Sequence, residues 1–310
     1  MKTPSITKQS QYKVGFFDFG RALTPATRFF NPAILHHNGS DWLIARRAEK
    51  IHWHRLGQNS LTAFKLDKDH KPIGFMDVYL KNRNYKDQHW EDPRVFWFQG
   101  KPCLSYCTFQ IFHNETYSGA HQQVAFLNDD LQPVETWDPI YGGNGGSILL
   151  NDGNEKNWIF FEHDGLLRTI YMTEPHQVVT WKDRQFEVLD TTSVKPWKWG
   201  HMRGGTNPIR IGDEYISFFH SSTPWTTKKR QYHMGVYAFE AKPPFKVTRI
   251  SSKPILSGSQ EDPWKEGLPL VVFPCGAVLG PKNVVVTMGV NDYVSAWIEI
   301  PVKELDSLMK

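Results

Sequence analysis

Two adjacent carboxylates, Glu91 and Asp92, are the residues of this sequence whose types and setting most directly indicate chemistry. They stand ahead of a β-forming run, in Trp90-Glu91-Asp92-Pro93-Arg94. Neighbouring side chains at a strand point to opposite faces, so one carboxyl group can enter a site while the other stays in the sheet. A carboxyl group sheltered beside aromatic rings can keep its proton near neutral pH, as a general acid must. We assign this role to Asp92 and predict a salt bridge for Glu91.

Other polar residues suited to binding or catalysis are scattered along the chain. Taken one at a time, each has an ordinary explanation, because Asx-Pro steps form turns and polar groups line most surfaces. Acids, arginines and histidines can serve one reaction only if the fold gathers them. The residues concerned are Asn31, Arg46, Arg94, Glu162, His163, Asn207, His220 and Asp292.

The elements that must position these residues are predicted to be β-strands. Short runs of β-forming residues are separated by Gly, Asn, Asp and Pro, and long helical periodicity is absent. The clearest runs lie at 41–45, 94–98, 158–161, 215–219 and 284–288, and one short helix is expected around 302–308. The sequence therefore predicts an all-β fold.

One pattern recurs five times: a Pro or small residue, a strand, a turn with glycine, and an aromatic-rich second strand. Its reference positions are Pro32, Pro93, Ser147, Pro208 and Pro274, at intervals of 61, 54, 61 and 66 residues. Each interval has room for a four-stranded sheet, which predicts a five-bladed β-propeller. We expect a single domain over 1–310, in which a strand at about 12–19 closes the last blade. A β-sandwich is the alternative.

A propeller would bring the scattered polar residues together at one mouth of its central channel. The residues just before the five inner strands are predicted to be Asn31, Asp92, Gly146, Asn207 and Phe273. The second strands are predicted to return to the same mouth and to end at Arg46, Cys107, Glu162 with His163, His220, and Asn291 with Asp292. We therefore expect Asp92, Glu162 and the basic residues to share one funnel.

These residues also carry a resemblance to glycoside hydrolase family 130, a family of five-bladed propellers that cleave β-mannosides by hydrolysis or phosphorolysis. The similar segments occur in the family's order over most of the chain: Asn31-Pro32-Ala33 with Arg46, Glu91-Asp92-Pro93-Arg94, Pro208-Ile209 with His220, Val272-Phe273-Pro274-Cys275-Gly276, and Gly289 to Asp292. The resemblance implies that Asp92 is the catalytic acid, which in this family can deliver its proton through a sugar hydroxyl. It also implies that Asn31, Arg46 and Asp292 hold the sugar and that His220 lies beside phosphate.

Further substrate contacts are predicted from the residues themselves. Arg94 and Asn207 would line the same mouth. Trp90, with Trp53 and Trp225, could stack on a sugar ring, although each indole could equally belong to the core of a blade.

The third repeat departs from the family pattern, which places an Arg and a Lys there for phosphate. Residues 137–146 contain no basic side chain, and 142–146 hold four glycines around Asn144, which suits either a ligand-binding or a plain flexible loop. Arg168, His201 and Arg203 are candidate replacements in a phosphate site with His220, because guanidinium groups suit phosphate. Alternatively, Glu162 would activate water, which in inverting hydrolysis requires two carboxyl groups about 6.5–9.5 Å apart.

The sequence thus favours an inverting carbohydrate-active enzyme that cleaves β-mannosides or related glycosides, with phosphate or water as the nucleophile. Two alternatives stay open: a glycosyltransferase that uses an activated sugar in the same funnel, and a non-catalytic sugar-binding propeller. Inorganic phosphate is the one co-substrate considered, and no other cofactor is expected. No metal site is predicted, because His36-His37 and His52-Trp53-His54 lack a third ligand at a diagnostic spacing.

The composition limits the binding partners and the cellular compartment that we expect for this protein. The net charge is +4 and the basic residues are dispersed, so neither nucleic acid nor a membrane surface is an expected partner. No apolar run approaches the ~18 residues of a transmembrane helix. Three cysteines fit no disulfide framework, and the polar N-terminal residues do not resemble a signal sequence. We expect a cytoplasmic protein with an oligosaccharide or glycoside substrate, and homo-oligomerisation is left open.

Overall fold

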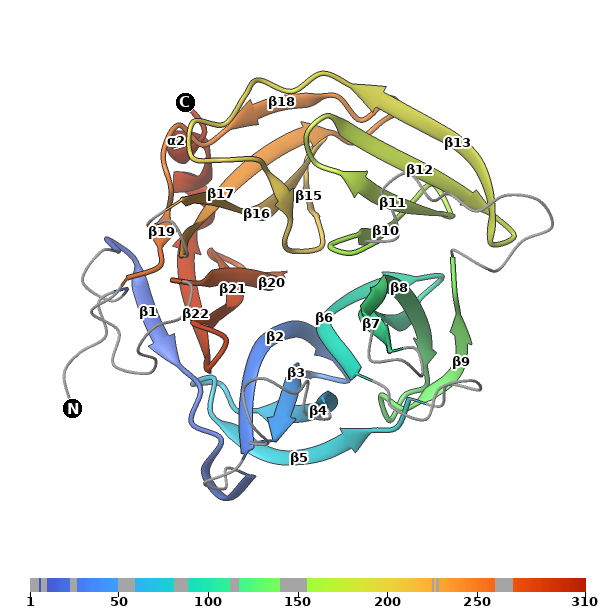
Figure 1. The fold of residues 1–310 in the computed structure, drawn as a ribbon, viewed down its shortest axis with the longest axis vertical. Coiled ribbons are helices and arrows are strands. Elements are labelled where there is room, and N and C mark those ends of the chain that lie inside the picture. Colours follow the sequence, from blue (N-terminus) through green and yellow to red (C-terminus); the bar gives the residue numbers. More distant parts are fainter. Residues whose placement is uncertain are drawn as a thin grey trace.

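Five antiparallel sheets surround one central axis in the computed structural model, which describes residues 6, 10–22, 27–49, 59–80, 89–111, 117–139, 155–224, 226, 229–259 and 270–310. Figure 1 shows β2, β6, β10, β15 and β20 nearest the centre of the ring, with the later strands of each sheet farther out. The architecture is the predicted five-bladed propeller, nearly all β. The short helix α2 (Leu305–Leu308) follows a 3₁₀ turn, η2 (Val302–Glu304), where the sequence predicts one.

In the first three blades, neighbouring strands of the sheet follow one another along the chain. Blade one contains β2 (Thr27–His37), β3 (Ser40–Glu49), β4 (Asn59–Leu66) and β5 (Pro72–Val78). Blade two contains β6 (His89–Phe98), β7 (Lys101–Ile111), β8 (Tyr117–Leu127) and β9 (Pro133–Trp137). Blade three contains β10 (Ile159–His163), β11 (Leu166–Met172), β12 (His176–Lys182) and β13 (Gln185–Thr192).

Blades four and five are less regular. Blade four contains β14 (Arg203–Gly204) and β15 (Ile209–Ile211), which both pair with β16 (Glu214–Pro224), followed by β17 (Arg230–Glu240), β18 (Val247–Ile250) and β19 (Leu256–Ser257). Blade five contains β20 (Val272–Leu279), β21 (Asn283–Val290) and β22 (Val294–Pro301), and its fourth strand is β1 (Lys13–Phe16), next to β22. The two ends of the described chain therefore meet in one blade.

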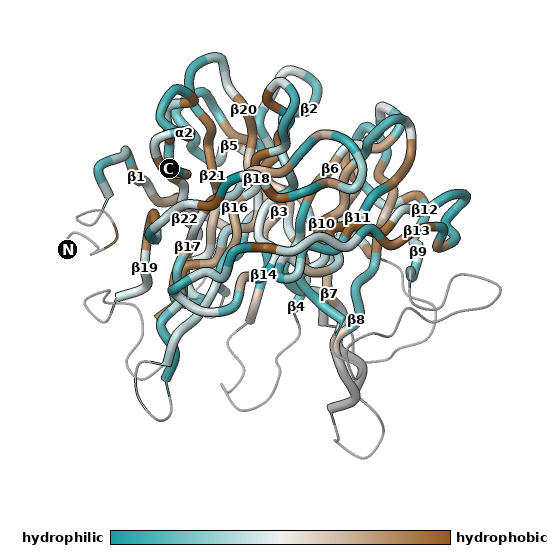
Figure 2. Tube along the Cα trace, turned by 90° about the horizontal axis from the view of Figure 1, so that it is seen from above, coloured by the Kyte–Doolittle hydropathy of each residue, from teal (hydrophilic) through white to brown (hydrophobic). Residues whose placement is uncertain are grey.

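Burial along the strands follows their position in the ring. Inner and middle strands such as β16 and β21 are buried over most of their length, whereas the outer strands β5 and β13 are largely exposed. The cores lie between blades because the sheets pack face to face. Several aromatic residues belong to these cores, including Trp137, Trp158 and Trp181 between blades two and three. In Figure 2 the turns are largely hydrophilic and the hydrophobic segments lie along the strands.

The inner strands share a common register that differs from the predicted one in two blades. Asn31, Asp92 and Phe273 each stand six residues before the last residue of their inner strand, and Asn157 and Gly205 stand at the same place in blades three and four. The sequence predicts Gly146 and Asn207 there instead. That prediction was based on small residues and X-Pro steps. The observed register of the inner strands is instead counted from the turn that ends each strand. Gly146 lies outside the described residues.

Among the described residues, no helix is long and apolar enough to cross a bilayer. The three cysteines, Cys103, Cys107 and Cys275, are free and buried.

Candidate active site

Asn31 and Asp92 occupy equivalent places in adjacent inner strands and adopt the same unusual backbone conformation. Their φ angles are 50° and 51°, and each lies at a bulge where the register with the neighbouring strand shifts. Asn and Asp tolerate this left-handed conformation better than most residues, and a bulge redirects side chains at the edge of a site. As a result the two side chains meet: Asn31 Nδ2 donates to Asp92 Oδ1 at 2.8 Å.

Arg46, from β3, joins both carboxylates of the Glu91-Asp92 pair. Its guanidinium lies 2.5 Å from Glu91 Oε1 and 3.5 Å from Asp92 Oδ1. Asn59 supports the arrangement by donating to Glu91 Oε1 at 2.9 Å and by accepting from Arg46 Nε at 3.2 Å. The predicted salt bridge of Glu91 is therefore present. The Glu91 side chain is 8% exposed and that of Asp92 is 22% exposed, so Asp92 is the carboxyl group that reaches the mouth.

The electrostatics of this cluster are dominated by burial and by three close acids. Burial raises the pKa of Glu91 to about 7; Arg46 opposes this shift, while Asp92 and Asp292 add to it. Burial alone would lower the pKa of Arg46, but Glu91, Asp92 and Asp292 together raise it. Arg46 therefore stays charged and holds the acids in place.

Asp292 reaches the same region from the turn between β21 and β22. Asn291 and Asp292 both have positive φ, at 55° and 49°. Asn291 anchors this turn, because its side-chain oxygen accepts from the backbone N–H of Val271 at 2.9 Å. The charge of Asp292 acts on Glu91 and Arg46, which places it with the predicted sugar-binding residues Asn31 and Arg46.

Tyr232, on β17, is a member of the site that the sequence analysis missed. Its ring lies over that of His220, with centroids 6.0 Å apart and planes at 14°. Burial raises the pKa of its hydroxyl, and the charges of Asp292 and Asp92 add to this effect. No sequence motif marks Tyr232, which lies eight residues after the end of β16. Only the pairing of β17 with β16 brings it next to His220.

Three basic residues gather on another side of the mouth. His220 is buried, and its ring centroid lies 4.4 Å from that of Phe273. Burial, followed by the charges of Arg94 and Arg203 and, more weakly, Lys156, holds the pKa of His220 well below its usual range, so the imidazole is neutral. Its Nδ1 has no hydrogen-bond partner within the described part of the chain. Arg203 is its direct neighbour across the β14–β16 ladder.

Lys156 is a site residue that the sequence did not predict. Its charge acts on Glu91 and Cys107 as well as on His220, so it lies within electrostatic reach of the Asp92 centre. It directly precedes Asn157, the blade-three counterpart of Asp92. The incorrect register in blade three hid this basic residue, because it placed the mouth of that blade at residue 146.

Arg94 does not face the mouth. The residue is 0% exposed, and its guanidinium donates to the carbonyls of Gly205 at 2.7 Å, Asp92 at 3.1 Å and Gly204 at 3.3 Å, and to Asn157 Oδ1 at 3.2 Å. The direct substrate contact predicted for Arg94 is therefore wrong. Arg94 instead ties the Asp92 bulge to blades three and four.

Glu162 lies at the other end of the inner strands, whereas Asn207 lies part-way along the channel, two residues beyond Gly205, the blade-four counterpart of Asp92. Glu162 is the next-to-last residue of β10 and accepts from the backbone N–H of Gln99, in the β6–β7 turn, at 2.5 Å. At ~3.3 Å per residue, five residues along β10 separate it by about 16 Å from the level of Asn157 and Asp92. This exceeds the spacing that inverting hydrolysis requires. The prediction that Glu162 and Asp92 share one mouth is wrong, because β10 is the inner strand of its blade and not the second strand.

The remaining predicted residues lie apart from Asp92. Arg168 is opposite Phe161 on β11, donates to the hydroxyl of Thr180 and lies over the Phe245 ring. His201 Nδ1 pairs with Glu174 at 3.4 Å. Neither belongs to the His220 and Arg203 group. Trp90 packs against the core of blades one and two, and its indole N–H is buried without a partner in the described structure, which does not favour stacking on a sugar.

Some sequence predictions fall on residues outside the described ranges: Trp53, Trp225, the histidines at 52 and 54, and the segment 142–146. Within those ranges, no group of three or more His, Cys, Asp or Glu side chains is arranged to hold a metal ion.

A scan against protein-family models matches residues 10–310 to the glycoside hydrolase 130 model, described as β-1,4-mannooligosaccharide phosphorylase. The chain belongs to glycoside hydrolase family 130. The match covers the whole propeller, and this family's members are glycoside phosphorylases and hydrolases that act on mannosides. It confirms the prediction of a carbohydrate-active enzyme of that class. No curated protein matches the sequence.

Solved structures share the fold at low sequence identity. A β-1,2-mannobiose phosphorylase from Listeria innocua, in complex with β-1,2-mannobiose, is 15% identical, with a TM-score of 0.68 over 93% of this chain and 94% of that chain. A mannose phosphorylase from Leishmania mexicana, in complex with a phosphate ion, is 13% identical, with a TM-score of 0.65 over 97% and 92%. A putative glycoside hydrolase from Parabacteroides distasonis is 14% identical, with a TM-score of 0.70 over 95% and 98%.

Proposed function

We propose that this protein cleaves a β-mannosidic bond by inverting phosphorolysis, with Asp92 as the general acid. The observation that supports phosphate as the nucleophile is the grouping of His220, Arg203 and Lys156 beside the Asp92 centre. The two cationic side chains form a suitable anion site. The neutral imidazole beside them has an Nδ1 without a partner among the described residues, which can accept a hydrogen bond from a protonated phosphate oxygen. Glu162, the carboxylate considered for water activation, lies at the opposite end of the channel.

In the proposed reaction, an oxygen of phosphate attacks the anomeric carbon from the face opposite the departing sugar oxygen. The bond between the anomeric carbon and that oxygen breaks, and its electron pair stays with the oxygen, which takes a proton from Asp92, directly or through a sugar hydroxyl. The products are mannose 1-phosphate of inverted configuration and the shortened saccharide. Asn31 Nδ2 fixes one oxygen of Asp92, which leaves the other to carry the proton. Arg46 and Asp292 would bind hydroxyl groups of the same sugar.

The nucleophile can be tested by incubating the protein with β-1,4- and β-1,2-mannobiose, with and without inorganic phosphate. We expect mannose 1-phosphate that requires phosphate, and synthesis in the reverse direction from mannose 1-phosphate and mannose. Release of free mannose without phosphate would establish hydrolysis instead. Activity only with a nucleotide sugar would establish transfer, and binding without turnover would establish a sugar-binding module.

The phosphate site can be tested separately with Lys156→Ala and Arg203→Ala. Each variant should raise the KM for phosphate by about tenfold, as expected for the loss of one charge-assisted contact, with a smaller change in the KM for mannobiose. Lys101→Ala, at an exposed position on β7 near the opposite end of the channel, is the matched control and should change neither value. Equal effects of Lys156→Ala on both substrates would contradict the assignment.

The general acid is tested with Asp92→Asn. This variant should lower kcat by about 10²–10⁴-fold, because it removes the proton donor, while mannobiose affinity measured by calorimetry stays within a fewfold of that of the unchanged protein. Turnover retained at the original rate would exclude Asp92 as the acid.

A further inference from the structure

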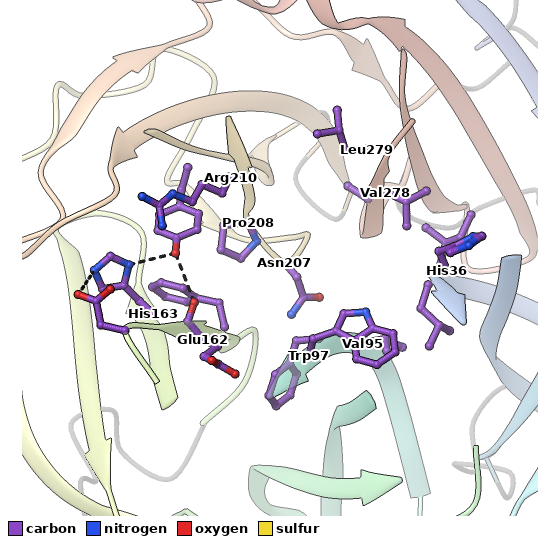
Figure 3. A pocket seen from close by; sticks show the side chains of 17 residues that line it. His36, Val95, Trp97, Glu162, His163, Asn207, Pro208, Arg210, Val278 and Leu279 are labelled. Carbon is purple, nitrogen blue, oxygen red and sulfur yellow. Dashed lines mark hydrogen bonds and ion pairs between the residues drawn. The ribbon is translucent and has the colours of Figure 1, made fainter. Parts of the chain in front are cut away.

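A cavity opens at the end of the channel opposite Asp92. Its volume is about 630 Å³, within the range typical of small-ligand sites. All five blades contribute to its lining, chiefly through the later residues of their inner strands (Figure 3). Asn207 and Pro208, which precede β15, and Tyr215, on β16, complete it. The polar and aromatic lining residues that bear on its chemistry are His36, Trp97, Glu162, Asp164, Asn207 and Arg210.

Asn207 provides this cavity with a hydrogen-bond acceptor that has no partner among the described residues. The residue is 8% exposed, and its Nδ2 donates to the carbonyl of Phe160 at 2.7 Å. This bond fixes the amide, and Oδ1 has no partner among the described residues. Figure 3 shows the side chain projecting toward the middle of the cavity. A buried acceptor without a partner lowers the stability of the folded protein. A ligand group that donates a hydrogen bond to this oxygen would remove that cost and so bind more tightly.

Trp97 supplies an apolar surface beside this acceptor. It is 41% exposed, a large value for a tryptophan whose ring also rests against His37 at a centroid distance of 5.9 Å. The contact with His37 and the position on an inner strand hold the ring in place. An indole held in this way can pack against the C–H face of a pyranose.

The charges around the cavity do not favour an anionic ligand, because its lining holds two carboxylates and one guanidinium. Glu162 and Asp164 are balanced in part by Arg210, and His36 pairs with Asp41 at 2.9 Å. Burial lowers the pKa of His163, an effect opposed by Asp164, whose carboxylate lies 3.2 Å from Nε2 of the imidazole. Glu162 has one oxygen fixed by the Gln99 N–H, so its carboxylate is oriented at the edge of the cavity as an acceptor of hydroxyl donors.

We propose that this cavity is a second saccharide-binding site, separate from the Asp92 centre. A neutral polyol donates hydroxyl groups to Asn207 Oδ1 and Glu162 while one sugar face covers Trp97. Arg94, which is fully buried and lies over the Phe273 ring at 5.4 Å, stands in the inner strands between the two ends of the channel.

The test uses Asp92→Asn protein, so that no substrate is consumed, titrated with β-1,4-mannobiose and β-1,4-mannotriose by calorimetry. We expect two binding events per chain. In the Asp92→Asn/Trp97→Ala protein one event should be lost or weakened at least tenfold while the other is kept. The matched control, Asp92→Asn/Phe186→Ala, removes an aromatic side chain of similar exposure, 46%, from the outer strand β13 and should keep both events.

Structures of the same protein soaked with mannotriose provide the second measurement. Sugar density against Trp97 and Asn207 is the expected result. One binding event that Trp97→Ala leaves unchanged, or a cavity that contains water alone, would overturn the proposal. These outcomes are distinct from failure of the proposed phosphorolysis, because the retained event in the Trp97→Ala protein reports the Asp92 site independently.

Discussion

Asp92 is held by a hydrogen bond from Asn31 as well as by its ion pair with Arg46, and the position of Asn31 depends on a glycine in another strand. A Cβ atom placed on Gly289, in β21, would collide with Asn31 Oδ1 and lie 3.0 Å from the backbone nitrogen of Asn31. No side chain fits there without moving Asn31. The role of Gly289 in the family-like segment from Gly289 to Asp292 is therefore to leave room for the amide that orients Asp92.

Gly289→Ala should consequently displace Asn31 and disorient Asp92. We expect kcat/KM on mannobiose to fall by about 10–10²-fold, the scale of a misplacement near 1 Å, with a smaller loss of stability. Gly74→Ala, in the outer strand β5 where an added Cβ meets nothing within 4 Å, is the control and should leave kcat/KM unchanged. An unaltered rate in the Gly289→Ala protein would show that the Asn31 contact does not matter for turnover.

At the scale of elements, the brace formed by Arg94 connects the site to three blades. A buried guanidinium that donates to three carbonyls and one side-chain amide satisfies acceptors that water cannot reach. Lysine offers one nitrogen and cannot span the same set of acceptors.

Arg94→Lys should therefore lower the free energy of unfolding by about 1–3 kcal/mol, the cost of leaving a buried carbonyl without a donor. Urea titration measures this change. Arg184→Lys, in an exposed ion pair with Glu135, is the matched control and should change stability by less than about 1 kcal/mol. If the two substitutions had equal effects, the bracing role of Arg94 would be refuted.

The elements also show how far sequence could lead. The strand runs, the five-fold recurrence and the Asn31-Pro32 and Asp92-Pro93 steps were sufficient to predict the propeller and the Asn31, Arg46 and Asp92 cluster. In blade three, Asn157 adopts the same positive φ, at 65°, but is followed by Trp158, so no X-Pro step marks it. The feature that blade three shares with blades one and two is the positive φ at this position, and the residue types alone do not predict it reliably.

The predicted register of the inner strand in blade four was wrong for a related reason. Gly205 is the true counterpart of Asp92, while Asn207-Pro208 lies two residues deeper in the channel. Hydrogen bonds between distant strands, such as those from Arg94 to Gly204 and Gly205, set this register. They join residues more than a hundred positions apart, which periodicity within one segment does not reveal.

At the scale of the whole molecule, the ring is closed by pairing of β1 with β22. The four residues from Lys13 to Phe16 pair with Ala296 to Glu299, and Phe17 and Phe19 pack with Phe29, Phe64 and Trp297. Gly15 lies directly over Trp297, where an added Cβ would collide with the indole. A residue larger than glycine would push β1 off the blade.

Gly15→Val should thus weaken the closure and lower the free energy of unfolding by about 1–3 kcal/mol, the usual cost of overpacking. Thermal unfolding followed by circular dichroism measures this change. Gly74→Val on the exposed strand β5 is its control. A Tm unaffected by Gly15→Val would mean that β1 contributes little to holding the ring.

Because β22 and the turn bearing Asp292 come late in the chain, the cluster around Asp92 is complete only when the last blade has been made. Asn31, Arg46 and Asp92 emerge early and can associate while translation continues, but Asp292 arrives some two hundred residues later. Until then β1 has no β22 to pair with. A nascent chain therefore lacks Asp292 and leaves β1 without its neighbouring strand until the last blade is made.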